Sequence, residues 1–169
     1  MMNKSNMSAN SSFIIHRSSF LTFWGPPLLL MAAIFFFSTD NFSGRNTGSI
    51  FFALFHAILP GLTEEQFRPF HFLIRKAGHF TEYGLLALLL FRAFRSGSAE
   101  RWRLRWALLS LAVVVIYALS DEYHQSFTAT REASVYDSML DASGGATALL
   151  VLGVARLMQG RRENRGVEG

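Results

Sequence analysis

The sequence contains no cysteine, which excludes disulfide bonds and thiolate chemistry. It also lacks the HExxH spacing of a common zinc site and shows no internal repeat. Charged residues are sparse within several long stretches, whereas half of all residues are hydrophobic. This distribution favours a membrane protein over a soluble domain.

The first apolar stretch, FLTFWGPPLLLMAAIFFF, covers residues 20–37 and carries no charge. Its length is close to the roughly 20 residues that cross a hydrocarbon core of about 30 Å. The run is longer than the apolar region of a signal peptide, contains Pro26 and Pro27, and is followed by no small-x-small cleavage site. We therefore interpret it as a membrane anchor.

Three further apolar stretches follow, at residues 80–94, 106–119 and 135–158. The middle one is about 21 Å long as a helix, so the polar residues after it are expected to continue the helix at membrane depth. The sequence thus predicts an all-α, polytopic bundle of about four transmembrane helices, a flexible tail before it and a basic tail after it. The predicted spans are about 20–38, 77–95, 104–124 and 135–158, within a domain of residues 20–158 between tails 1–19 and 159–169.

The loop after the first span contains SIFFALFHAILPGL. Its apolar core of about ten residues is too short to cross a bilayer, and Pro60 and Gly61 would end a helix there. We expect a short interfacial or re-entrant helix, with His56 as an interfacial polar residue rather than a ligand.

The net charge of +4 is interpreted as an orientation signal and not as a nucleic-acid site, because the basic residues lie in short loops between apolar runs. Arginines are dense in segments 92–105 and 156–165. The positive-inside rule makes both cytoplasmic. With four spans, the N-terminus is then also cytoplasmic, and loops 38–78 and 120–134 face outward.

Polar residues recur at helical spacing at the outer ends of the later spans. One face is formed by Lys76, His79 and either Glu82 or Tyr83. A second is formed by Tyr117, Asp121 and Gln125, and a third by Asp137, Asp141, Gly144 and Ala148.

The predicted topology brings these three faces to one side of the membrane. An ionisable group at bilayer depth costs several kcal/mol unless it faces the bundle interior and finds a partner. We therefore predict a polar pocket that opens to the outer face. Gly144 and Gly145, with Ala142, Ala146 and Ala148, predict close helix packing.

The spacing of these residues resembles the VanZ-like family of small bacterial membrane proteins over most of the chain. The resemblance rests on Lys76-x-x-His79-Phe80-x-Glu82-Tyr83, Asp121-Glu122-x-x-Gln125-x-Phe127, Arg131, Asp137 and Gly144. It implies a multi-pass protein of the bacterial cytoplasmic membrane, and a link to teicoplanin resistance through the family's namesake, but no reaction. Asp141 stands where asparagine is common in the family and adds a carboxylate to the predicted pocket.

One hypothesis is an outward-facing enzyme that acts on an envelope lipid or a cell-wall precursor. His79 would be the acid or base and Glu82 would orient it, while Asp121 and Glu122 would share a proton or hold a divalent metal. Lys76 or Arg131 would bind a phosphate or carboxylate. The candidate catalytic residues are His79, Glu82, Asp121, Glu122 and Asp137, and the candidate binding residues are Lys76, Tyr83, Gln125, Arg131 and Asp141.

Two alternatives stay open beside the enzyme. The first is a non-catalytic binding or shielding module, in which the polar residues form an interhelical network. The second is the metal or ion site of a carrier, although no tight ligand spacing and no inverted repeat is evident. The expected partners are the bilayer and an amphiphilic envelope molecule, and the sequence predicts no particular oligomer.

Overall fold

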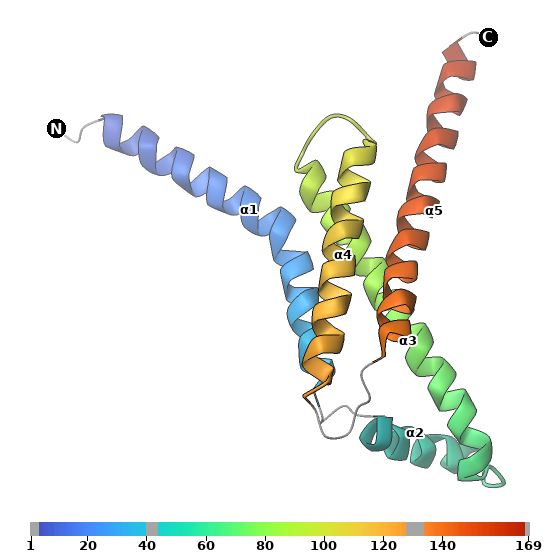
Figure 1. Ribbon diagram of the computed structural model, residues 1–169. Coiled ribbons are helices and arrows are strands. Elements are labelled where there is room, and N and C mark those ends of the chain that lie inside the picture. The colour runs from blue at the N-terminus through green and yellow to red at the C-terminus, as the bar shows by residue number, and fades with distance from the viewer. Residues whose placement is uncertain (1–3, 40–43, 128–133, 168–169) are drawn as a thin grey trace.

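The computed structural model describes residues 4–39, 44–127 and 134–167, with side chains for 20–39, 47–127 and 134–161. Within these residues the protein is all-α, as predicted, and contains no strand. Figure 1 shows the arrangement of its helices. They are α1 (Lys4–Phe37), α2 (Gly44–Ile58), α3 (Glu64–Arg95), α4 (Leu104–Gln125) and α5 (Val135–Val167).

Three of these helices are long and apolar enough to cross a membrane: Phe20–Phe37 of α1, Leu104–Gln125 of α4 and Val135–Arg161 of α5. They coincide with three of the four predicted spans. The remaining predicted span lies in α3, whose polar residues among the apolar ones lower its mean hydropathy. Helix α3 contacts each of the other four helices, and its polar residues Lys76, His79 and Glu82 are partly buried, whereas Thr81 and Arg92 are exposed.

Helix α1 begins at Lys4, inside the segment for which the sequence predicts a tail. It contains Pro26 and Pro27 and changes direction part-way along (Figure 1). A proline inside a helix removes one backbone hydrogen bond and clashes with the preceding turn. The two prolines thus account for the change of direction.

Both ends of α3 are set by local sequence. At its start, the Thr63 side chain accepts a hydrogen bond from the Gln66 amide, and the Gln66 side chain accepts one from the Thr63 amide. This capping box satisfies two amides that have no partner within the helix. At its end, Ser96 (φ 44°) and Gly97 (φ 77°) adopt left-handed backbone conformations, and Gly97 does so without steric penalty.

Small residues bring α3 and α5 into close contact, as the sequence predicts. A Cβ atom on Gly144 would lie 2.2 Å from the carbonyl oxygen of Phe80, and one on Gly84 would lie 3.3 Å from the carbonyl oxygen of Gly144. Around this contact the core contains Tyr83 and Leu86 of α3, both fully buried. Lys76, His79 and Phe80 of α3 meet Asp137, Asp141 and Gly144 of α5 in the same order along the chain, so the two helices run parallel.

The predicted short helix is present as α2, which ends before Pro60 and lies across one end of the bundle (Figure 1). The rings of Phe52 and Phe55 each lie 5.6 Å from that of Phe67 in α3. His71 stacks on Phe67 and fits beneath α2 because Gly48 has no side chain. A Cβ on Gly48 would lie 3.3 Å from the His71 ring.

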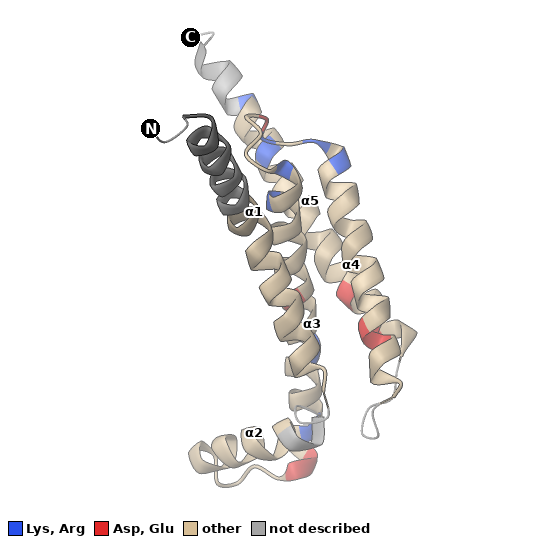
Figure 2. Cartoon of the chain, turned by 90° about the vertical axis from the view of Figure 1, so that its left-hand side faces the viewer, with Lys and Arg blue, Asp and Glu red and all other residues tan. Residues whose placement is uncertain are grey.

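The two ends of the bundle differ in charge. Both chain termini and the α3–α4 connection lie at one end, which we call the basic end, and α2 lies at the other, which we call the α2 end (Figure 1). Figure 2 shows Lys and Arg gathered around the α3–α4 connection and the last part of α5, while Asp and Glu lie mainly toward the α2 end.

Candidate functional site

Two polar pairs join α3 to α5 near the α2 end. The Lys76 ammonium forms a salt bridge with Asp137. One turn further along both helices, Nδ1 of His79 lies 3.6 Å from Oδ1 of Asp141. The His79 ring is about one-quarter exposed, whereas the Asp141 side chain is almost fully buried. These contacts confirm that Lys76 and His79 share one helical face, and that Asp137 and Asp141 share another.

A buried hydrogen-bond network joins α4 to the end of α1. The Ser38 hydroxyl donates to Oδ2 of Asp121 at 2.7 Å, and the Gln125 amide donates to the same oxygen at 2.8 Å and to Ser38 at 3.3 Å. Asp121 and Gln125 therefore share a face, as their spacing predicts. Sequence reasoning missed Ser38, although a hydroxyl directly after a run of phenylalanines was the available signal.

Glu122 has different partners from its neighbour Asp121. Its carboxylate accepts a hydrogen bond from the backbone amide of Ser134 at 2.8 Å, which ties the end of α4 to the start of α5. Asp121 instead faces Ser38 and Gln125. The Asp121 carboxylate therefore connects α4 to the end of α1, and the Glu122 carboxylate connects α4 to the start of α5.

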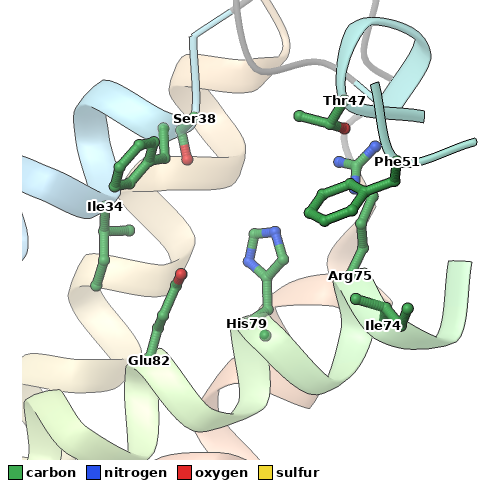
Figure 3. A pocket seen from close by; sticks show the side chains of 10 residues that line it. Ile34, Ser38, Thr47, Phe51, Ile74, Arg75, His79 and Glu82 are labelled. Carbon is green, nitrogen blue, oxygen red and sulfur yellow. The ribbon is translucent and has the colours of Figure 1, made fainter. Parts of the chain in front are cut away.

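A pocket of about 270 Å³ lies between α1, α2 and α3. Figure 3 shows the His79 ring in its middle, with Ser38 and Glu82 on one side and Arg75 and Phe51 on the other. The remaining lining residues are Ile34, Phe37, Thr47, Ile74 and Gly78. Of the predicted site residues, the pocket is therefore lined by His79 and Glu82, with Asp141 in contact with the His79 ring.

The other predicted residues lie outside this pocket or beyond the described part of the chain. Lys76 and Asp137 pair with each other across α3 and α5, and Gln125 donates to Asp121 of its own helix and to Ser38 after α1. Tyr83 is fully buried beside the Tyr117 ring, at 6.1 Å between centroids. Arg131 lies outside the described residues.

Three buried oxygens within the described part of the chain have no hydrogen-bond partner: the Tyr83 hydroxyl, Oδ1 of Asp121 and Oδ1 of Asp141. They come from three different helices, α3, α4 and α5. Buried polar atoms without partners are uncommon, and they gather at sites where a protein binds a ligand or exchanges a proton.

The residues in and beside the pocket suit acid–base and anion-binding chemistry. Among residues 20–39, 47–127 and 134–161, whose side chains the structure describes, no three His, Asp or Glu side chains lie together as a metal site would require. The His79 imidazole can act as an acid or a base and lies 3.6 Å from a carboxylate oxygen of Asp141, and the Arg75 guanidinium suits a phosphate or carboxylate.

The fold and the site define an α-helical membrane protein that holds a polar pocket at one end of its bundle. A model of the VanZ/LLP1 family matches residues 23–156. The chain belongs to this family, which confirms the resemblance in the sequence, and the match includes every predicted site residue. No curated protein and no solved structure matches the chain.

Proposed function

We propose that α1, α3, α4 and α5 are four membrane spans of a protein of the bacterial cytoplasmic membrane, with both termini cytoplasmic. The central position of α3 among three apolar helices supports its assignment as a span, since interior helices tolerate polar residues that lipid-facing ones do not. The arginines of the basic end support the orientation. Residues 1–19 and 159–169 then flank a membrane domain on the cytoplasmic side.

Helix α2 lies in the outer interface under this proposal. One side of it packs on α3 through Phe52 and Phe55. Another side exposes Ile50, Leu54 and Ile58, which are 70%, 57% and 72% exposed and recur every four residues. An apolar stripe of this kind is stabilised by contact with the acyl chain boundary of a bilayer.

The pocket binds, and acts on, the headgroup of an amphiphilic envelope molecule such as a lipid-linked cell-wall precursor. The observation that carries this proposal is that polar and apolar side chains line the same pocket. Arg75, His79 and Glu82 provide charge and proton exchange, and Ile34 and Phe37 of α1 add apolar surface. A headgroup with an attached chain matches both kinds of side chain.

Within this site, His79 is the candidate acid or base and Asp141 orients its ring. Sequence reasoning gave the orienting role to Glu82, but the contact at 3.6 Å is with Asp141. Glu82 lines the same pocket, where it can accept a hydrogen bond from a ligand hydroxyl. Arg75 neutralises an anionic group of the ligand.

A non-catalytic binding or shielding module is the second candidate, and the interhelical network favours it. Asp121, Gln125, Lys76 and Asp137 already have protein partners, so these polar residues stabilise the bundle without any reaction. Both candidates place the ligand in the same pocket. They differ in that only the enzyme changes the ligand chemically.

The test is to replace His79 by Ala in the native host and to measure protein abundance, the envelope lipid profile and teicoplanin susceptibility. His124→Ala is the matched control, because His124 also lies near the α2 end but packs on Phe35 outside the pocket. We expect His79→Ala to change the lipid profile at normal abundance and the control to leave it unchanged. Unchanged lipids and susceptibility in His79→Ala at normal abundance would overturn the proposal.

A further inference from the structure

A second cavity, far from the polar pocket, lies between α4 and α5 at the basic end. It is a groove of about 400 Å³ with almost entirely apolar walls. Its walls include Leu104, Leu108 and Leu111 of α4, and Leu150, Val154 and Leu157 of α5. No charged residue lines it, so it suits a hydrocarbon chain.

An indole ring forms part of the groove at the basic end. Trp102 lies against α5 at Gly153, where a Cβ atom would come within 3.1 Å of the ring. The Phe91 ring also stacks on the indole, with 5.0 Å between the ring centroids. Tryptophan is enriched at the level of lipid headgroups, so this part of the groove lies where a headgroup would be.

Two arginines lie near the groove at the basic end. Arg161 follows Leu157 by four residues and Val154 by seven, so it extends the groove-lining face of α5 by one turn. Its side chain is exposed. On α4, the exposed Arg105 guanidinium lies over the Trp106 ring, 5.7 Å from its centroid. A guanidinium matches the geometry of a phosphate group.

We propose that this groove binds an anionic phospholipid, with an acyl chain between α4 and α5 and its phosphate at Arg161. Basic sites between transmembrane helices are known to bind anionic headgroups. A second copy of the chain is a less favourable occupant of the groove. Two copies related by a two-fold axis along the membrane normal would bring their two Arg161 side chains together, and these positive charges repel each other. The site is independent of the function proposed for the pocket at the α2 end.

The experiment is native mass spectrometry of the purified, delipidated full chain with phosphatidylglycerol or phosphatidylethanolamine of identical acyl chains. We expect tighter binding of phosphatidylglycerol. Arg161→Gln is expected to weaken phosphatidylglycerol binding about tenfold, the effect of losing one charge-assisted contact, and to weaken phosphatidylethanolamine less, because the ammonium of that lipid offsets the charge of its phosphate. Arg156→Gln is the matched control, because Arg156 lies on a different face of α5 and hydrogen-bonds to Gln159.

A second variant tests the groove itself. Ala146→Leu places a larger side chain in the groove and is expected to weaken both lipids, whereas Ala155→Leu on the opposite, exposed face of α5 is expected to weaken neither. Equal binding of the two lipids by the unmodified chain would overturn the proposal, as would equal losses in the two alanine variants. A dimer that Ala146→Leu dissociates would identify a second copy as the occupant and overturn it too.

Discussion

The two ends of this bundle differ in where their charged side chains lie. At the α2 end, several charged side chains form contacts between neighbouring segments, namely Lys76–Asp137, His79–Asp141 and Asp121–Ser38. At the basic end, Arg105 and Arg161 are exposed and the cavity between the helices is apolar. A charge within a bundle needs a partner because desolvation is costly, whereas a charge at the surface stays hydrated.

This comparison also separates two kinds of polar residue within the α2 end. Asp121 and Gln125 are buried and hydrogen-bonded to each other and to Ser38, and these contacts favour a structural role. His79 and Glu82 line a pocket, which is a position for a ligand. Variants of the first kind are expected to change abundance, and variants of the second kind are expected to change function at constant abundance.

The largest loss of stability is expected from a change at the close contact between α3 and α5. Gly144→Ala places a methyl group 2.2 Å from the Phe80 carbonyl oxygen, and a backbone atom cannot move away without separating α3 from α5. We expect a loss of about 1 to 3 kcal/mol or more in stability, seen as low membrane abundance and a lower melting temperature. Gly160→Ala, with no atom within 4 Å of the added carbon, is the control. Equal stability of the two variants would contradict the observed packing.

The next largest effect is expected from the α1–α4 network. Asp121→Ala leaves the Ser38 hydroxyl and the Gln125 amide without their shared acceptor, at a cost of about 1 to 3 kcal/mol. Asp121→Asn keeps an acceptor oxygen and is expected to lose less. Thermal unfolding in detergent measures both. If Asp121→Ala keeps normal stability and alters the envelope lipids instead, Asp121 belongs to the site and not to the structural network.

A smaller effect is expected for the Lys76–Asp137 pair, because about one-quarter of Lys76 and one-third of Asp137 remain exposed. A double-mutant cycle with Lys76→Met and Asp137→Asn is expected to give a coupling energy of about 1 kcal/mol or less. The coupling should decrease at high salt. A coupling energy of zero at low salt would show that this contact adds nothing to the α3–α5 interface.

The smallest effect on stability is expected from protonation of His71, which lies in the part of α3 before the predicted span. Burial of its ring, together with the positive charge of Arg75, lowers the pKa of His71 from 6.5. The unfolded state then binds more protons, so the stability that His71 contributes is present above about pH 6.5 and is lost as pH falls below it.

Hydrogen exchange of the α2 backbone at pH 7.5 and pH 5.5, corrected for intrinsic rates, measures this effect. We expect weaker protection at the lower pH in the unmodified chain, because His71 packs against α2 at Gly48 and Phe51. His71→Phe keeps the stacked ring but cannot bind a proton, and its protection is expected to be independent of pH. The same pH response in both chains would assign the effect to another group.

Much of this fold could be predicted from the sequence because it depends on local periodicity. The apolar runs give α1, α4 and α5, and the spacing of Asp137, Asp141 and Gly144 gives the face of α5 that meets α3. These features are set by helix geometry alone. The position of α3 at the centre also explains why a predicted span falls below the hydropathy of a lipid-facing helix.

The pocket was less predictable because its walls come from segments that are distant in the sequence. Thr47 and Phe51 reach it because α2 folds back on α3, and Ser38 reaches it because the end of α1 packs near α3. The contact between His79 and Asp141 depends on the rotation of α5 against α3, which the sequence alone does not give. The groove between α4 and α5 is a gap in side-chain packing, which no sequence pattern indicates.

The most direct test of the central claim is mass spectrometry of the amphiphiles that co-purify with the chain, in an Ala146→Leu background that fills the basic-end groove. His79→Phe fills the polar pocket in the same background. We predict that an anionic amphiphile co-purifies with the Ala146→Leu chain and is lost from the double variant at equal abundance and stability. Identical extracts from the two proteins would contradict a ligand site at the α2 end.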